Sequence, residues 1–307
     1  MTRLPPGVAA IIPSVFAMAL TDAIIKQWSA GISLWQIWVL RSLIVLPVLF
    51  VMARGRVTAP GAVWIGLRCG ALILMYLAMY PALPLIDMAL AGAAFYTAPL
   101  FIAGLSALVL GQRISGLQWG AILVGFAGLL VIVRPFGAAF TPVVILPVLA
   151  ALCYACAAVV TRARCLHVGP VVMAFWLNVA FLACGALGAA VLQVGPQVQI
   201  DFPLLFARWQ PMAMADWAIL LGLCLLMIGV AIGVARAYQS PQPAVIATLE
   251  YCYMIFATFW GFVFFGERPE LWTFAGMVLI AAGGCAVLLA PRGRTQGHPA
   301  TALGVKR

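Results

Sequence analysis

Residues 89–111 read ALAGAAFYTAPLFIAGLSALVLG, and residues 244–266 read AVIATLEYCYMIFATFWGFVFFG. Both are long apolar runs that begin with alanine, carry a tyrosine at the same place and end in glycine. The matching positions are separated by one constant offset of 155 residues, as for Tyr96 and Tyr251. The recurrence predicts that the chain contains two related halves.

The flanking segments support the repeat. Gly111-Gln-Arg-Ile-Ser and Gly266-Glu-Arg-Pro-Glu each follow one of the two runs, and each precedes a further apolar run that closes at Pro135 or Pro291. Near the start of each half, Ile12-Pro13 corresponds to Leu146-Pro147. We therefore predict a first repeat over 1–137, a second over 138–291 and a tail over 292–307.

The composition indicates a membrane protein. The chain is 66% hydrophobic and 8% charged, with a mean hydropathy of +1.15, whereas soluble domains carry about 25% charged residues. A spanning helix needs about 20 apolar residues. Ten windows qualify: 8–27, 33–53, 63–80, 86–110, 116–134, 142–161, 170–192, 215–236, 243–265 and 271–290.

The predicted fold is all-α and polytopic, with ten transmembrane helices arranged as two inverted five-helix repeats around a central cavity. Five is odd, so the second copy enters the bilayer from the opposite side. Inverted halves can exchange conformations and open a central site first to one face and then to the other. The polar stretch 193–215 is expected to lie at the interface with some structure of its own.

The positive charges indicate topology. The net charge of +10 comes from scattered residues rather than from a clustered basic face, which argues against nucleic acid as a partner. With the N-terminus inside, 12 Lys and Arg residues fall on the cytoplasmic side and 4 outside, as the positive-inside rule requires. We predict cytoplasmic termini and a retained first helix rather than a signal peptide.

The motifs resemble the EamA type of the drug/metabolite transporter superfamily over nearly the whole chain. They are Lys26, Arg41, Ala98-Pro99-Leu100, Gly111-Gln112-Arg113, Leu249-Glu250-Tyr251 and Gly266-Glu267-Arg268-Pro269. Gln112 departs from the glutamate usual in that family. Within the family, the sequence is most similar to amino-acid exporters of the YddG type. The resemblance implies a ten-helix carrier of the bacterial inner membrane that exports amino acids or related metabolites.

Charges at membrane depth are candidates for function because each is costly there. Asp22 and Lys26 lie one turn apart in the first helix, and Arg41 lies at similar depth in the second. These charges either meet a zwitterionic substrate or brace the two helices through an Asp22–Arg41 pair. Glu250 is a candidate for proton coupling or substrate binding, and the alternative is a structural acid braced by Arg236 or Tyr238.

Polar aromatic and amide groups complete the predicted cavity, because a buried phenol needs a partner for its hydroxyl. Tyrosines also serve as interfacial anchors, which is the alternative interpretation. The predicted lining residues are Tyr76, Tyr80, Tyr96, Tyr154, Gln239 and Tyr251.

Prolines at matching places between helices predict hinges, unless these segments are only short turns. They are Pro81 and Pro84 in the first half and Pro241 and Pro243 in the second. Four further prolines predict kinks within helices: Pro13, Pro47, Pro99 and Pro147.

Other classes of function fit poorly. The two histidines, His167 and His298, lie in a connector and the tail, and no Walker loop occurs. The cysteines lie mostly in apolar runs, where they act as small hydrophobes. We predict no enzymatic activity, no cofactor and no metal. The expected partners are a small-molecule substrate and the lipid bilayer, in a monomer or homodimer, and a different solute, a channel or a lipid scramblase remains the alternative.

Overall fold

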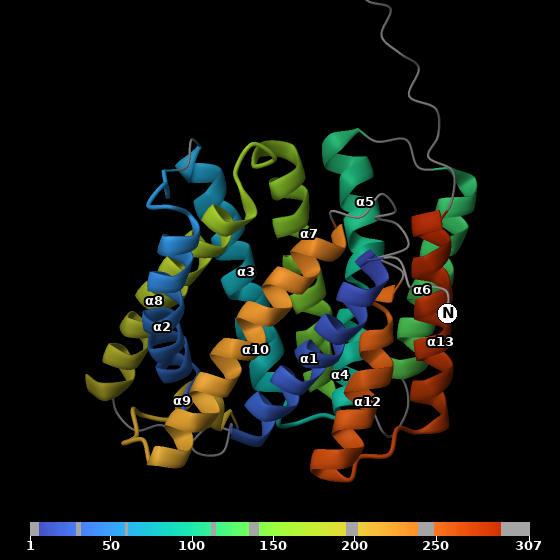
Figure 1. The fold of residues 1–307 in the computed structure, drawn as a ribbon. Coiled ribbons are helices and arrows are strands. Elements are labelled where there is room, and N and C mark those ends of the chain that lie inside the picture. Colours follow the sequence, from blue (N-terminus) through green and yellow to red (C-terminus); the bar gives the residue numbers. More distant parts are fainter. Residues whose placement is uncertain are drawn as a thin grey trace, which may run out of the picture.

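The computed structural model describes residues 6–28, 32–58, 61–111, 115–134, 141–194, 202–238 and 249–289. The described elements are helices (Figure 1). In the first part of the chain they are α1 (Pro6–Trp28), α2 (Leu34–Met52), α3 (Ala62–Ala82), α4 (Met88–Phe95), α5 (Ala98–Leu110) and α6 (Gly116–Val133). In the second part they are η1 (Pro142–Val144), α7 (Ile145–Arg164), α8 (Pro170–Val194), α9 (Pro203–Phe206), α10 (Met214–Tyr238), α12 (Cys252–Phe265) and α13 (Leu271–Leu289).

The helices have the length and composition of membrane spans. Eight segments are long and apolar enough to cross a bilayer, with α4 and α5 counted together, and α12 and α13 are shorter apolar helices. Large apolar side chains point outward, such as Leu108 at 81% and Leu271 at 79% exposure. In a soluble protein these side chains would face water, whereas lipid solvates them at no cost. The all-α polytopic prediction is confirmed.

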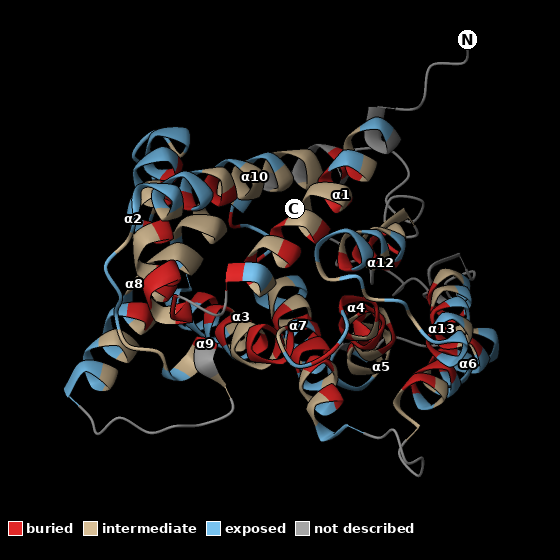
Figure 2. Ribbon diagram, turned by 90° about the horizontal axis from the view of Figure 1, so that it is seen from below, coloured by how far each residue is buried: buried red, intermediate tan, exposed pale blue. Residues whose placement is uncertain are grey.

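Helices far apart in sequence form the main packing pairs. Figures 1 and 2 show α6 beside α13 at one side of the bundle and α2 beside α8 at the other. The α6–α13 pair approaches closely because glycines face one another: a Cβ at Gly276 would lie 2.7 Å from the Gly128 carbonyl oxygen. Small residues allow this approach between membrane helices.

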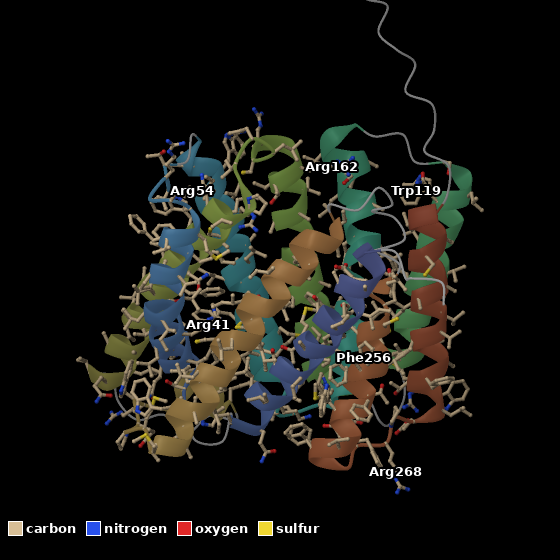
Figure 3. The ribbon with its side chains drawn as sticks, in the orientation of Figure 1. Arg41, Arg54, Trp119, Arg162, Phe256 and Arg268 are labelled. Atoms are coloured by element: carbon tan, nitrogen blue, oxygen red, sulfur yellow. The ribbon has the colours of Figure 1, made fainter. Side chains whose placement is uncertain are left out.

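The bundle has two chemically different ends (Figure 3). One end, here the arginine-rich end, carries Arg54 and Arg162, and the other carries Arg268. The start of α6, marked by Trp119, lies at the arginine-rich end, whereas the connector after α12, marked by Arg268, lies at the opposite end. This geometry suits inverted halves, and the repeat boundaries stay a prediction.

Two predicted helices are interrupted near their middles. The window 86–110 breaks at Tyr96–Thr97 between α4 and α5, and a turn at Glu250–Tyr251 precedes α12. In the first break, Pro99 at the start of α5 has no amide hydrogen for the preceding turn. The Thr97 hydroxyl donates to the Ala94 carbonyl oxygen at 2.7 Å. The window 86–110 is still a single candidate span, Met88–Val109, and its break lies beside the kink expected at Pro99.

The stretch 193–215, expected to have some structure of its own at the membrane interface, contains a short helix. The short helix α9 lies in this stretch, and Leu204 within it is fully buried against the bundle. Residues 195–201 and 239–248 lie outside the described part of the chain.

Candidate functional site

A carboxylate and three tyrosines meet where the two interrupted helices turn. Asp22 of α1 accepts a hydrogen bond of 2.6 Å from the hydroxyl of Tyr253 in α12. The Tyr253 ring stacks on Tyr96 at 5.0 Å between centroids, and Tyr96 contacts Tyr251 at 5.6 Å. The helix breaks thus place polar rings around an acid in the membrane interior. Tyr253 was missed in the sequence, because its repeat counterpart is Ala98 and no local pattern marks it.

A second aromatic group surrounds Arg41. Tyr76 contacts Tyr80 at 5.1 Å and Phe181 at 5.2 Å between ring centroids. The Arg41 guanidinium lies 4.6 Å from the centre of the Phe181 ring and donates to the Met227 sulfur at 3.2 Å. With Asp22 bonded to Tyr253 instead, the considered Asp22–Arg41 pair does not form in this structure.

An ion pair links three segments at the end opposite the arginine-rich end, which we call the closed end. The Lys26 ammonium lies 2.5 Å from Glu267 Oε1 and donates to the Ile86 carbonyl oxygen at 2.6 Å. Glu267 Oε2 accepts from the Met88 amide at 2.7 Å. The Lys26 and Glu267 side chains are only 9% and 11% exposed. Lys26 therefore joins α1 to the connectors before α4 and after α12, and its predicted role in the cavity stays a prediction.

Asp87 lies beside this ion pair at the start of α4. Its side chain is exposed, yet desolvation and the Glu267 charge raise the pKa of its carboxyl, against the opposing effect of Lys26. The closed end therefore concentrates negative charge around a single ammonium.

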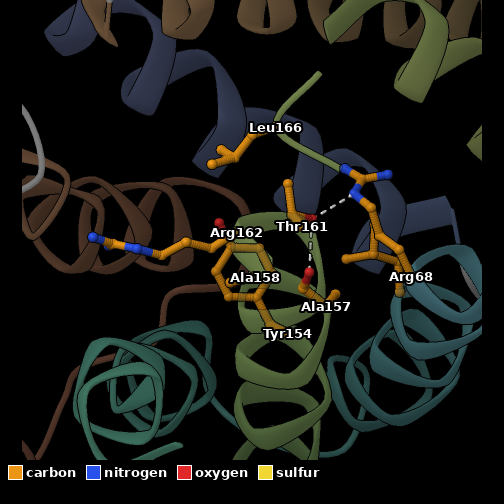
Figure 4. A pocket seen from close by; sticks show the side chains of 8 residues that line it. Arg68, Tyr154, Ala157, Ala158, Thr161, Arg162 and Leu166 are labelled. Carbon is orange, nitrogen blue, oxygen red and sulfur yellow. Dashed lines mark hydrogen bonds between the residues drawn. The ribbon is translucent and has the colours of Figure 1, made fainter. Parts of the chain in front are cut away.

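A cavity of about 530 Å³ lies between α3 and α7 towards the arginine-rich end (Figure 4). Arg162 and Leu166 lie at its exposed mouth, and Tyr154 lies about two helical turns from Arg162 along α7. Its lining consists of Arg68, Leu72, Tyr154, Ala157, Ala158, Thr161, Arg162 and Leu166.

Aromatic contacts connect this cavity to the cluster formed by Asp22 and its three tyrosines. Tyr154 contacts Phe95 at 5.8 Å, and Phe95 contacts Tyr96 at 6.1 Å between centroids. Tyr76 and Glu250 lie within electrostatic range of the Tyr154 hydroxyl. The structure thus brings most of the predicted cavity residues into one region, from Tyr154 at the cavity to Asp22 beyond it.

The remaining predicted residues lie elsewhere or outside the description. Pro81 lies in the last turn of α3 and Pro84 in the following connector. Gln239, Pro241 and Pro243 are outside the described residues. Arg68 and Thr161 were not singled out in the sequence, because a lone arginine near a helix start also fits a topology signal.

Nothing in the described part of the chain is arranged to hold a metal ion, since no group of three His, Cys, Asp or Glu side chains gathers there. The eight cysteines are free. The chemistry of the site consists of charges, hydroxyls and aromatic faces.

A polytopic helical bundle with a cavity towards one end and a buried ion pair at the other fits the class of membrane transport proteins. Residues 5–134 match the EamA-like transporter family. These residues therefore form a domain of this family, within the drug/metabolite transporter superfamily, as the motifs predict.

Similar proteins of known role are bacterial. The chain is 27% identical over 281 residues to the pseudopaline exporter CntI from two Pseudomonas aeruginosa strains, a match that covers 90% of this chain and 94% of the exporter. It is 25% identical over 187 residues to a riboflavin transporter of Vibrio cholerae, covering 60% and 58% of the two chains. A solved crystal structure at 20% identity shares the fold, with a TM-score of 0.59 over 91% of this chain and 96% of that one.

Proposed function

We propose that the protein is a secondary transporter that exports small metabolites, amino acids foremost, across the bacterial inner membrane by alternating access. The observation that carries the proposal is a cavity towards one end of the bundle together with a buried ion pair at the other. The 530 Å³ cavity lies towards the arginine-rich end, whereas the Lys26–Glu267 pair joins three segments at the other end. This combination suits a carrier in a conformation that is open to one side of the membrane.

The orientation follows from the positive-inside rule, under which arginine-rich connectors stay in the cytoplasm. The cavity then faces the cytoplasm, as an exporter requires when it loads its substrate. Both termini lie inside in this orientation.

Charge placement supports an amino acid as substrate. The region between the cavity and Asp22 has basic groups on one side and acids on the other. Arg41 and Arg68 belong to α2 and α3, whereas Asp22 and Glu250 belong to α1 and the turn before α12. A zwitterion presents one charge of each sign to such walls. The two similar proteins, named as exporting pseudopaline and transporting riboflavin, favour a small organic solute in general, so another such solute is the nearest alternative.

Glu250 is the proposed coupling group. It lies in the turn that interrupts its helix, where main-chain polar groups and an acid occupy membrane depth together. The hinges proposed at Pro81, Pro84, Pro241 and Pro243 flank the interrupted helices, so the halves are expected to rock about these points.

The test uses the purified full-length protein in liposomes, with counterflow of labelled amino acids across a panel. Saturable exchange that falls at least tenfold in Glu250→Gln supports the proposal. Glu270→Gln is the matched control, since Glu270 is 58% exposed and lies at the far end. Ion currents without saturation, or lipid transbilayer movement that is the same in both variants, would identify a channel or a scramblase instead.

A further inference from the structure

Arg68 has an unusual environment for a residue near a helix start. Its Nε donates to the Thr161 hydroxyl at 3.0 Å, and that hydroxyl in turn donates to the Ala157 carbonyl oxygen at 2.7 Å (Figure 4). Because the hydroxyl proton is used in the bond to the main chain, the Thr161 oxygen acts only as an acceptor towards Arg68. The guanidinium is consequently fixed in place between α3 and α7.

One terminal nitrogen of this guanidinium lacks a partner, although the Cys69 thiol lies within hydrogen-bonding reach of the group. Nη1 of Arg68 is buried and has no hydrogen-bond partner. A buried donor without an acceptor is costly, and more so when it is charged. An arginine that merely marks topology would instead extend into water or between lipid headgroups.

The charges of the cavity lining favour an anion as the ligand. Among the described residues that line the cavity, Arg68 and Arg162 are charged, Thr161 and Tyr154 are polar, and none is acidic. In Figure 4, Arg162 lies on the opposite side of Tyr154 from Arg68, and its side chain extends away from both. The planar guanidinium fork matches a carboxylate with two parallel hydrogen bonds.

We propose that Arg68, held by Thr161, is the residue that binds the carboxylate of the transported solute in the open cavity, so that the substrates are small carboxylic acids. Tyr154, a residue that is 40% exposed, lies next along the cavity, where its side chain meets the rest of the solute. The proposal rests on the proposed function, because it assigns the substrate class of that same site.

The first experiment measures efflux. Liposomes containing the full-length protein are loaded with a mixture of amino acids, small dicarboxylic acids, their amides, amines and sugars, and the solutes that leave are identified by mass spectrometry. Solutes that leave are expected to carry a carboxylate, and Arg68→Gln should slow their efflux by about tenfold or more, with the larger effect on apparent KM. Arg68→Lys, which keeps the charge without the fork, should fall between. Arg56→Gln, an exposed arginine at the same end, should leave efflux unchanged.

Efflux of solutes that lack a carboxylate, or undiminished efflux of acids by Arg68→Gln, overturns the assignment of Arg68. Absence of any efflux from the unaltered protein overturns the proposed function instead, and a binding measurement then decides the site separately.

The binding measurement is thermal unfolding in detergent with succinate, succinamide or phosphatidylglycerol. Stabilisation by succinate alone, lost in Arg68→Gln and kept in Arg56→Gln, supports a site for free carboxylates. Equal effects of succinate and succinamide, or no effect of either, contradict it. Stabilisation by phosphatidylglycerol and not by succinate assigns the anion site to a lipid headgroup and also overturns the proposal.

Discussion

The ion pair between Lys26 and Glu267 offers a direct test of how the closed end is held. Glu267→Gln removes the negative charge while a side-chain oxygen remains to accept from the Met88 amide. Lys26 keeps its hydrogen bond to Ile86 but loses both the counter-charge and the hydrogen bond to Glu267 Oε1. A comparable glutamate in the same connector, Glu270, pairs with Arg134 and serves as control.

The expected magnitudes differ because burial differs. Removing one partner of a buried pair costs about 3–5 kcal/mol, since the other charge is left without compensation. The side chains of Lys26 and Glu267 are still 9% and 11% exposed to solvent. We therefore expect the lower value, roughly 3 kcal/mol, for Glu267→Gln. Glu270 is 58% exposed and Arg134 31%, so Glu270→Gln should cost no more than about 1 kcal/mol.

The assay is reversible unfolding of the purified protein by SDS titration in mixed micelles. Lys26→Met, Glu267→Gln and the double variant form a thermodynamic cycle, in which the two single losses should add to clearly more than the double loss. Strict additivity, or equal losses in Glu267→Gln and Glu270→Gln, would show that this pair does not hold the closed end.

Tyr253→Phe removes the donor to Asp22 and should lower the free energy of unfolding in the same titration by about 1–3 kcal/mol, while an unchanged value would mean that the bond contributes nothing. Gly276→Leu pushes α13 away from α6 and should cost about 1–3 kcal/mol or more. Gly104→Leu, where a side chain meets open space, is its control, and equal losses would refute the packing argument. Asp87→Asn should raise the melting temperature at pH 7, because the raised pKa means that the folded state disfavours the charged carboxyl. That gain should disappear as the pH falls to the ordinary carboxyl pKa of about 3.9, and melting curves across pH with no such convergence would contradict the explanation.

The sequence was sufficient to predict features that depend on composition over long stretches. Apolar runs of spanning length identified the helices, because the bilayer demands about 20 such residues at a time. The kink expected at Pro99 marks the first helix break. The second break could not be found in this way, since the position that corresponds to Pro99 is Met254.

Partners across the bundle were beyond local patterns. Lys26 and Glu267 are 241 residues apart, and Arg68 and Thr161 are 93 apart, so only the packing of their helices brings them together. Arg68 also satisfies the positive-inside rule, so its charge alone carried no sign of a second role. The depth of Lys26 and Asp22 was judged from helix position, but whether they face a cavity or a neighbour depends on helix rotation, which an evenly apolar sequence does not specify.

The cavity that ends near Tyr154 has an electrical consequence. In the proposed orientation, water that fills it from the cytoplasm would carry the cytoplasmic potential to that depth, so the insulating layer would be thinner than the hydrocarbon core. The membrane voltage then falls mainly between Tyr154 and Lys26, at about 2.3 kcal/mol per unit charge for 100 mV. For a charged solute, arrival at Arg68 should therefore be insensitive to voltage, whereas the crossing beyond Tyr154 should carry the charge movement that electrical recordings from proteoliposomes detect.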